Sequence, residues 1–175
     1  MALDPQTLAD GLASIEDYPA NETIVIDGWA DAWADYFEES TANGVAANTA
    51  PAAAITAFKA ALVGISGDNT AEEAATMIKN ACKAFWTAAI PTLAYTTTPS
   101  AAPGPYLTPP LFMLTPQAEL DLVADIQEAF EDNASGFVAK EAALLAVAEA
   151  IDGEVQAGAT FLDTTVPTPI LYTVA

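Results

Sequence analysis

The chain has 175 residues, of which 53% are hydrophobic, and it carries 24 acids against four lysines, with no arginine and no histidine. This length suits one domain that buries a core without metals or disulfides. The formal net charge of −20 repels nucleic acid and anionic membranes, so we expect neither as a partner. The missing histidine and arginine exclude histidine-based catalytic triads, imidazole metal sites and guanidinium clamps for anionic substrates.

Helix signals follow one another through the first part of the chain. Asp4-Pro5 is typical of a helix start, and we expect a short helix from there to about Asp17. A second helix is predicted over roughly 22–42, ending near Asn43-Gly44. A third begins at 48–51, with apolar residues at helical spacing as far as Ile65.

The second predicted helix contains the unusual stretch DGWADAWADYFEES, residues 27–40. On a helical wheel its aromatic residues Trp29, Trp33, Tyr36 and Phe37 share one side, and the acids fall on the opposite side. The rings and the carboxylates therefore cannot form one small site. We predict a buried aromatic stripe with a solvated acidic face; the alternative is that the acidic face binds a basic partner.

The fourth predicted helix starts after a turn at 66–69. The sequence Thr70-Ala71-Glu72-Glu73 has the form of a capping box, and the helix should reach the low nineties. Cys82, the only cysteine, has apolar neighbours at helical spacing. We expect a buried structural thiol, because no histidine or arginine is present to lower its pKa.

Residues 91–116 contain seven prolines and are predicted to be an irregular connection, neither a helix nor a central strand. Thr115-Pro116 starts a fifth helix, for which Leu120, Val123, Ile126 and Phe130 are the predicted core face. Residues 133–136 break the pattern, and a sixth helix, marked by apolar residues from Phe137 onward, ends near Gly158. The remaining residues read as an extended tail or an edge strand.

The predicted fold is therefore all-α: a bundle of about five to six helices with a Pro-rich irregular connection and an extended C-terminal tail. The bundle domain spans 1–158, with the Pro-rich connection at 91–116 within it, and the Thr/Pro-rich tail spans 159–175. The amino terminus has neither a basic region nor a long apolar run, and no stretch approaches the ~18 apolar residues of a membrane span. We therefore expect a protein of the cytoplasm, or of a particle assembled there.

Two groups of acids could in principle bind a metal ion, but each has a simpler structural explanation. Asp27, Asp31 and Asp35 are one turn apart on the acidic face, and the acids around 67–73 fit a turn and a helix cap. We predict no metal, no cofactor and no catalytic residue. A hydrolase that uses two carboxylates ranks lowest, because with 24 acids some pair always looks suitable and none is marked by local sequence.

Several runs of the chain resemble small helical proteins encoded among the virion genes of tailed bacteriophages. They are GWADAWADYFEES, the alanine-rich AAAITAFKAALVGI, and AATMIKNACKAFWTAAI leading into TPPLF. The closing AIDGEVQAGATFLDTTVPTP is similar to the ends of such proteins. The resemblance implies a non-enzymatic structural subunit of the neck, tail or capsid decoration, located in the virion and assembled in the host cytoplasm. It also implies other virion structural proteins as partners and a homo-oligomer or symmetric ring, and it carries over no catalytic residue.

Extended segments that contain proline are suited to lie across a neighbouring subunit or to add a strand to its sheet. The apolar residues of these segments are our candidate contacts: Tyr106, Leu107, Phe112, Phe161, Leu162, Val166, Ile170, Leu171 and Tyr172. An acidic adaptor or inhibitor that caps a basic protein surface is the alternative function. A saline environment would also explain the acidity.

Overall fold

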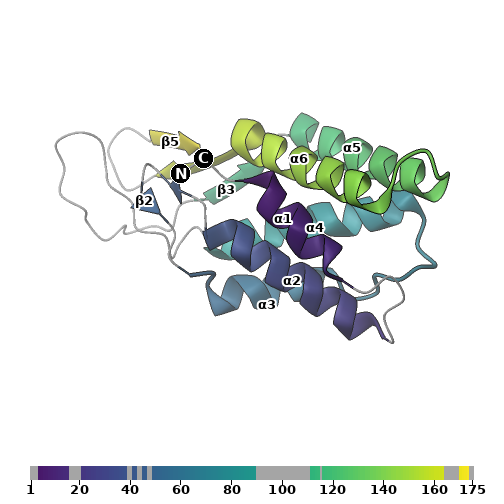
Figure 1. Ribbon diagram of the computed structural model, residues 1–175. Helices are drawn as coiled ribbons and strands as arrows, with labels where there is room; N and C mark the ends of the chain where they lie inside the picture. Colours follow the sequence, from purple (N-terminus) through teal and green to yellow (C-terminus); the bar gives the residue numbers. More distant parts are fainter. Residues whose placement is uncertain are drawn as a thin grey trace.

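The computed structural model describes residues 4–15, 21–38, 41–42, 45–46, 49–89, 111–114, 116–163 and 170–173. Their helices are α1 (Pro5–Ala13), α2 (Glu22–Glu38), α3 (Ala52–Ala61), α4 (Ala71–Ala89), α5 (Pro116–Ala134) and α6 (Lys140–Gly158). The predicted all-α bundle of five to six helices is confirmed. Each helix packs on its neighbours in the sequence, and α1 packs on α6 to close the ring (Figure 1).

The core is built around aromatic rings from α2, α3 and α4. The ring of Trp33 lies 5.2 Å from that of Phe58, 5.5 Å from that of Tyr36 and 5.7 Å from that of Phe85, measured between centroids. Phe37 packs edge-on against Phe85 at 4.9 Å. Aromatic pairs at such separations each contribute about 1 kcal/mol beyond the burial of their area. The core therefore depends on the aromatic stripe of α2.

The predicted division of α2 into two faces is confirmed. Trp33 is fully buried and Trp29 is 6% exposed, whereas Asp31 and Asp35 are exposed. Neither tryptophan lines the grooves beside α5 that are described below.

The ends of the first two helices differ from the prediction. α1 ends at Ala13, because the hydroxyl of Ser14 turns back to donate to the carbonyl of Gly11 at 2.6 Å. α2 ends at Glu38, and Thr41–Ala42 (β1) pairs antiparallel with Val45–Ala46 (β2). The Asn-Gly pair between these strands favours two-residue hairpin loops as strongly as it favours helix ends, which explains the wrong boundary at 42.

The predicted capping box of α4 is confirmed. The backbone N–H of Glu73 donates to Oγ1 of Thr70 at 3.2 Å, and the N–H of Thr70 donates to Oε2 of Glu73 at 2.8 Å. At the end of α5, Gly136 adopts a φ of 75°, and the N–H of Phe137 donates to the carbonyl of Asp132 at 2.9 Å. This is a Schellman ending, and it starts the turn into α6.

The predicted core face of α5 is confirmed in part: Ile126 is buried and Val123 and Phe130 pack against the core, but Leu120 does not. The buried residues of α5 are Ala118, Leu122, Ile126 and Ala129, whereas Leu120 is 66% exposed. The alanines let α5 approach α4 and α6 closely, so the buried face is centred between those two helices. Phe137, predicted to mark the sixth helix, lies before it and is 81% exposed.

A small antiparallel sheet lies at the end of the bundle opposite the turn between α5 and α6 (Figure 1). Its strands are β3 (Leu111–Leu114), β4 (Ala159–Asp163) and β5 (Ile170–Thr173), with β4 in the middle. β4 follows α6 directly, and β3 contacts α4 and α6. The sheet therefore joins part of the Pro-rich connection to part of the tail. The rest of the connection up to Thr115, and residues 164–169 of the tail, lie outside the described residues.

Candidate interaction site

The sheet brings together most of the candidate contact residues. Its register pairs Phe112 with Phe161 and Phe161 with Tyr172, so three aromatic residues form one row across the strands. The next row pairs Leu111 with Leu162 and Leu162 with Leu171, and Ile170 lies opposite Asp163. Tyr106, Leu107 and Val166 lie outside the described residues.

The two outer strands of this sheet have different surroundings. β3 contacts helices α4 and α6, whereas β5 pairs with β4 alone among the described strands. An outer strand presents backbone N–H and carbonyl groups to which a further strand can add. The outer edge of β5 is therefore the best candidate in the described sheet for pairing with another chain.

Three of the four lysines connect one helix to another, and the fourth, Lys140, contacts the backbone just beyond α1. Nζ of Lys59 on α3 lies 2.8 Å from Oδ1 of Asp27 on α2. Lys79 and Lys83 on α4 both bind Glu119 on α5, the first at 3.4 Å.

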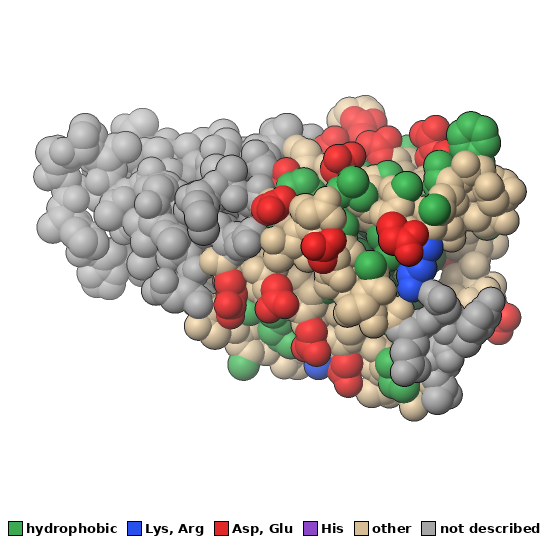
Figure 2. Space-filling view, viewed as in Figure 1, with side chains coloured by type: hydrophobic (Ala, Val, Ile, Leu, Met, Phe, Trp, Pro, Cys, Tyr) green, Lys and Arg blue, Asp and Glu red, His purple; other side chains and the backbone are tan. Residues whose placement is uncertain are grey.

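Nζ of Lys140, at the start of α6, donates to the carbonyl of Ile15 just beyond α1 at 3.1 Å. Every cationic side chain thus makes a contact within the bundle, so the positive charge does little to balance the acidic exterior. The helical face in Figure 2 accordingly shows many acidic side chains and little lysine surface.

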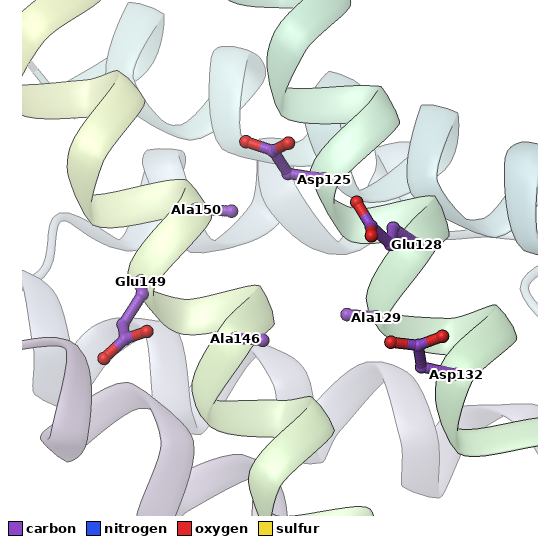
Figure 3. Close-up of a pocket in the computed structure, with 7 residues that line it drawn as sticks. All are labelled: Asp125, Glu128, Ala129, Asp132, Ala146, Glu149 and Ala150. Atoms are coloured by element: carbon purple, nitrogen blue, oxygen red, sulfur yellow. The ribbon is translucent and has the colours of Figure 1, made fainter. Parts of the chain in front are cut away.

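An acidic groove of about 490 Å³ runs between α5 and α6. Asp125, Glu128 and Asp132 follow one another along α5, with three alanines between the helices, and Glu149 on α6 points away from α5 (Figure 3). The groove has no lysine in its lining. Nearby, partial burial and then the charges of Asp121 and Asp125 raise the pKa of Glu154 above its usual value.

A second groove, of about 570 Å³, lies on the other side of α5, against α4. Leu120, Val123 and Ala124 give it an apolar lining, and Lys79 and Glu119 meet beside them. Sequence reasoning did not single out either groove. The available signal was the division of α5 itself, with acids at 121, 125, 128 and 132 on one side and apolar residues at 120, 123 and 124 on the other.

The single thiol of the chain is buried in the core. Cys82 is 1% exposed, so its predicted burial is confirmed, and this burial raises the pKa of its thiol well above the usual range. Among the described residues, no cluster of three or more histidine, cysteine or acidic side chains is placed to hold a metal ion. Within the same residues, no helix combines the length and apolar character needed to cross a membrane.

Comparison with known proteins adds no family to this description. The sequence matches no protein-family model, and neither the curated proteins nor the solved structures gave a significant match.

Proposed function

We propose that the protein is a non-enzymatic structural subunit of a tailed-phage particle, in its neck, tail or capsid decoration. In this proposal it assembles through its extended segments with other virion proteins or with further copies of itself. The sequence resemblance to small helical virion proteins suggests the class of particle. The chain also lacks histidine and arginine, and its only cysteine is buried.

The observation that best supports this proposal is the pairing of β3 with β4 and of β4 with β5. It places strands from two separate non-helical segments side by side at one end of a helical bundle. The bundle supplies a rigid base, and the outer strand β5 offers an edge for a neighbouring subunit. Repeated in every copy, a contact of β5 with a different surface of the neighbour generates a ring or a filament, whereas β5 against β5 gives a closed dimer.

The first test is an inventory of phage particles purified by density gradient, made by quantitative mass spectrometry. We expect the chain in a fixed copy number relative to the other particle proteins. Its presence in the lysate but not in the particles would contradict the proposal.

The second test removes the outer strand. A chain truncated at Thr164 lacks β5, and we expect it to keep its helical circular dichroism but not to enter the particles. The full-length variant Gly153→Ala is the control, because nothing lies within 4 Å of the added methyl group. If the truncated chain joins particles as well as this control does, the tail does not carry assembly.

A second candidate function is favoured by the acidic groove between α5 and α6. In this reading the protein is an adaptor or inhibitor that caps a basic protein surface. The groove combines three carboxylates along one helix with an absence of lysine in its lining. Such a surface attracts a basic partner over a distance set by the salt concentration.

The two functions differ in their response to salt and to charge removal. For the adaptor we expect binding to a lysine-rich helical peptide that weakens steeply with salt and is reduced by the pair Asp125→Asn and Glu128→Gln. The control pair Asp31→Asn and Asp35→Asn removes the same charge from the exposed face of α2. Equal losses from both pairs, or binding that salt does not change, would argue against the groove as a specific site.

A further inference from the structure

Leu120 is an exposed apolar side chain within an apolar groove. Its side chain is 66% exposed, and it lines the groove between α4 and α5 together with Val123 and Ala124. Grouped apolar surface of this kind, rimmed by polar residues, is typical of a protein contact, whereas single exposed apolar residues are ordinary. The groove is therefore a candidate surface for contact with another protein.

The charged side chains in and beside the groove indicate which partner can bind there. The groove is lined by Glu72, Lys79 and Glu119, and Lys83 also binds Glu119. Lys79 and the neighbouring Lys83 offset Glu72 and Glu119, and with Glu131 on the same face of α5 the surface keeps one excess negative charge, on a molecule whose net charge is −20. Two copies of this chain repel each other over most of their surfaces, and least where the local negative charge is small.

The groove on the other side of α5 shows the contrast. Its acids are Asp125, Glu128, Asp132 and Glu149, and no cation lines it. Two copies meeting there would bring like charges together, which opposes association. Of the two grooves along α5, the one against α4 combines apolar surface with nearly balanced charge.

We propose that a second copy of this chain docks on the α4–α5 groove, with the two α5 helices antiparallel about a twofold axis. This surface is separate from the sheet, and the proposal does not depend on a role in phage particles. Along this side of α5, exposed and half-buried residues recur at helical spacing: Pro116, Leu120, Val123, Ala124, Gln127 and Glu131. An axis between Val123 and Ala124 sets Leu120 against Gln127 of the partner subunit.

The same axis sets Pro116 against Glu131 of the partner subunit. Lys83 lies at this end of α5, because it binds Glu119, and its side chain is 43% exposed. Lys83 can therefore reach Glu131 of the partner subunit, and the symmetry forms this ion pair twice. A basic partner would instead meet Lys79 in the groove and Lys83 beside it, so the charges favour a second copy of this chain.

The main test compares Leu120→Glu with Val63→Glu in the full-length protein by sedimentation equilibrium. Val63 is a matched control: it is 69% exposed, it lies in the turn after α3, and it is not part of the groove lining. We expect a reversible dimer of the natural chain, weakened by about tenfold or more by Leu120→Glu and unchanged by Val63→Glu. Both changes add one negative charge at an exposed position, and circular dichroism checks that both variants fold.

A second pair of variants tests the ion pair. Glu131→Lys should weaken the dimer, because it places a lysine against Lys83 of the partner subunit. Glu128→Lys makes the same charge change one turn earlier on α5, in the acidic groove, and should not weaken it. If both variants strengthen association, net charge alone controls it and the proposed orientation is wrong.

Three further results would overturn the proposal. One is a natural chain that stays monomeric at every concentration tested. Another is an equal effect of Leu120→Glu and Val63→Glu. The third is a dimer that survives Leu120→Glu but is lost in Leu171→Pro, a change that disrupts β5 opposite Leu162. That last result would place self-association in the sheet, and so would support assembly through the extended segments while removing the groove contact.

Discussion

The hydroxyl of Tyr36 on α2 donates a hydrogen bond to Oδ1 of Asp152 on α6, over 2.8 Å and across 116 residues of sequence. The two helices are separated by α1, which packs against both of them. Tyr36 is fully buried, and this burial, followed by the charge of Asp152, raises the pKa of its phenol well above its usual range. The side chain of Tyr36 thus belongs to the aromatic core and also links α2 to α6 through its hydroxyl.

Tyr36→Phe tests this hydrogen bond. The change keeps the ring against Trp33 but removes the donor to Asp152, so we expect a loss of about 1 to 2 kcal/mol in the free energy of unfolding. Urea denaturation measures the loss. Thr87→Val serves as a control, since the Thr87 hydroxyl bonds only within its own helix in the described structure. A Tyr36→Phe variant as stable as the natural protein would show that the bond contributes nothing net.

Gly11 permits the close crossing of α1 and α2. A methyl group added at Gly11 would lie 2.6 Å from Cβ of Ala32, too close for the two helices to keep their positions. We expect Gly11→Ala to lower the free energy of unfolding by roughly 1 to 3 kcal/mol. Gly153→Ala is the matched control within α6, where the space is open, and it should stabilise by about 0.5 to 1 kcal/mol. Thermal unfolding compares them, and equal effects would contradict the close-crossing explanation.

Glu154 should make stability depend on pH. Burial and the neighbouring charges of Asp121 and Asp125 raise its pKa in the folded protein, so between the unfolded value of about 4.3 and the folded value the native state binds more protons. The contribution of Glu154 to stability is therefore present at low pH and is lost as the pH rises through this window. Glu154→Gln should remove that contribution to the pH dependence and stabilise the protein at neutral pH.

Denaturation across pH 4 to 7, a range set to include the usual carboxyl pKa of about 4.3, checks this prediction. Asp31→Asn removes the same charge from the exposed face of α2 and controls for the change in net charge. A difference in pH dependence between the two variants is expected. If they behave alike, the effect belongs to the overall charge of the protein and not to the surroundings of Glu154.

Salt should stabilise the fold. The four lysines are engaged within the bundle, and most acids of the described residues are exposed or half-buried on an exterior with little positive charge. Raising the ionic strength from ~0.01 M to ~0.15 M shortens the Debye length from about 30 Å to about 8 Å and screens this repulsion. We expect the melting temperature to rise with sodium chloride but not with an equal concentration of glucose. A melting temperature that falls with salt would mean that the lysine contacts outweigh the repulsion.

The features predicted best from the sequence were those carried by local patterns. The aromatic stripe of α2 and the capping box of Thr70 and Glu73 each depend on residues within a few turns of one another. The end of α2 was misplaced because Asn-Gly suits two kinds of turn. Sequence spacing alone does not choose between them.

The spacing of acids and apolar residues divides α5 into two sides, but it does not predict the grooves themselves, because these depend on which helices become neighbours. Leu120 was assigned to the core since its size and spacing suit burial, but the buried face of α5 is set by Ala118 and Ala129, where close helix packing is possible. Likewise, Glu119 meets Lys79 and Lys83 from 40 and 36 residues away. Such contacts depend on the tertiary arrangement of the helices. The spacing of hydrophobic residues and the amino-acid composition do not determine that arrangement.

The placement of the lysines affects how the protein can be detected. Trypsin cuts only after lysine and arginine, so it has four cleavage sites in this chain, and all of them lie on folded helices that contact another helix or its end. The native protein should therefore resist trypsin, and the denatured chain should give a few very long peptides. Digestion of the denatured chain with a protease that cleaves after acidic residues gives shorter peptides. Mass spectrometry can then measure the copy number of this protein more accurately than after trypsin digestion.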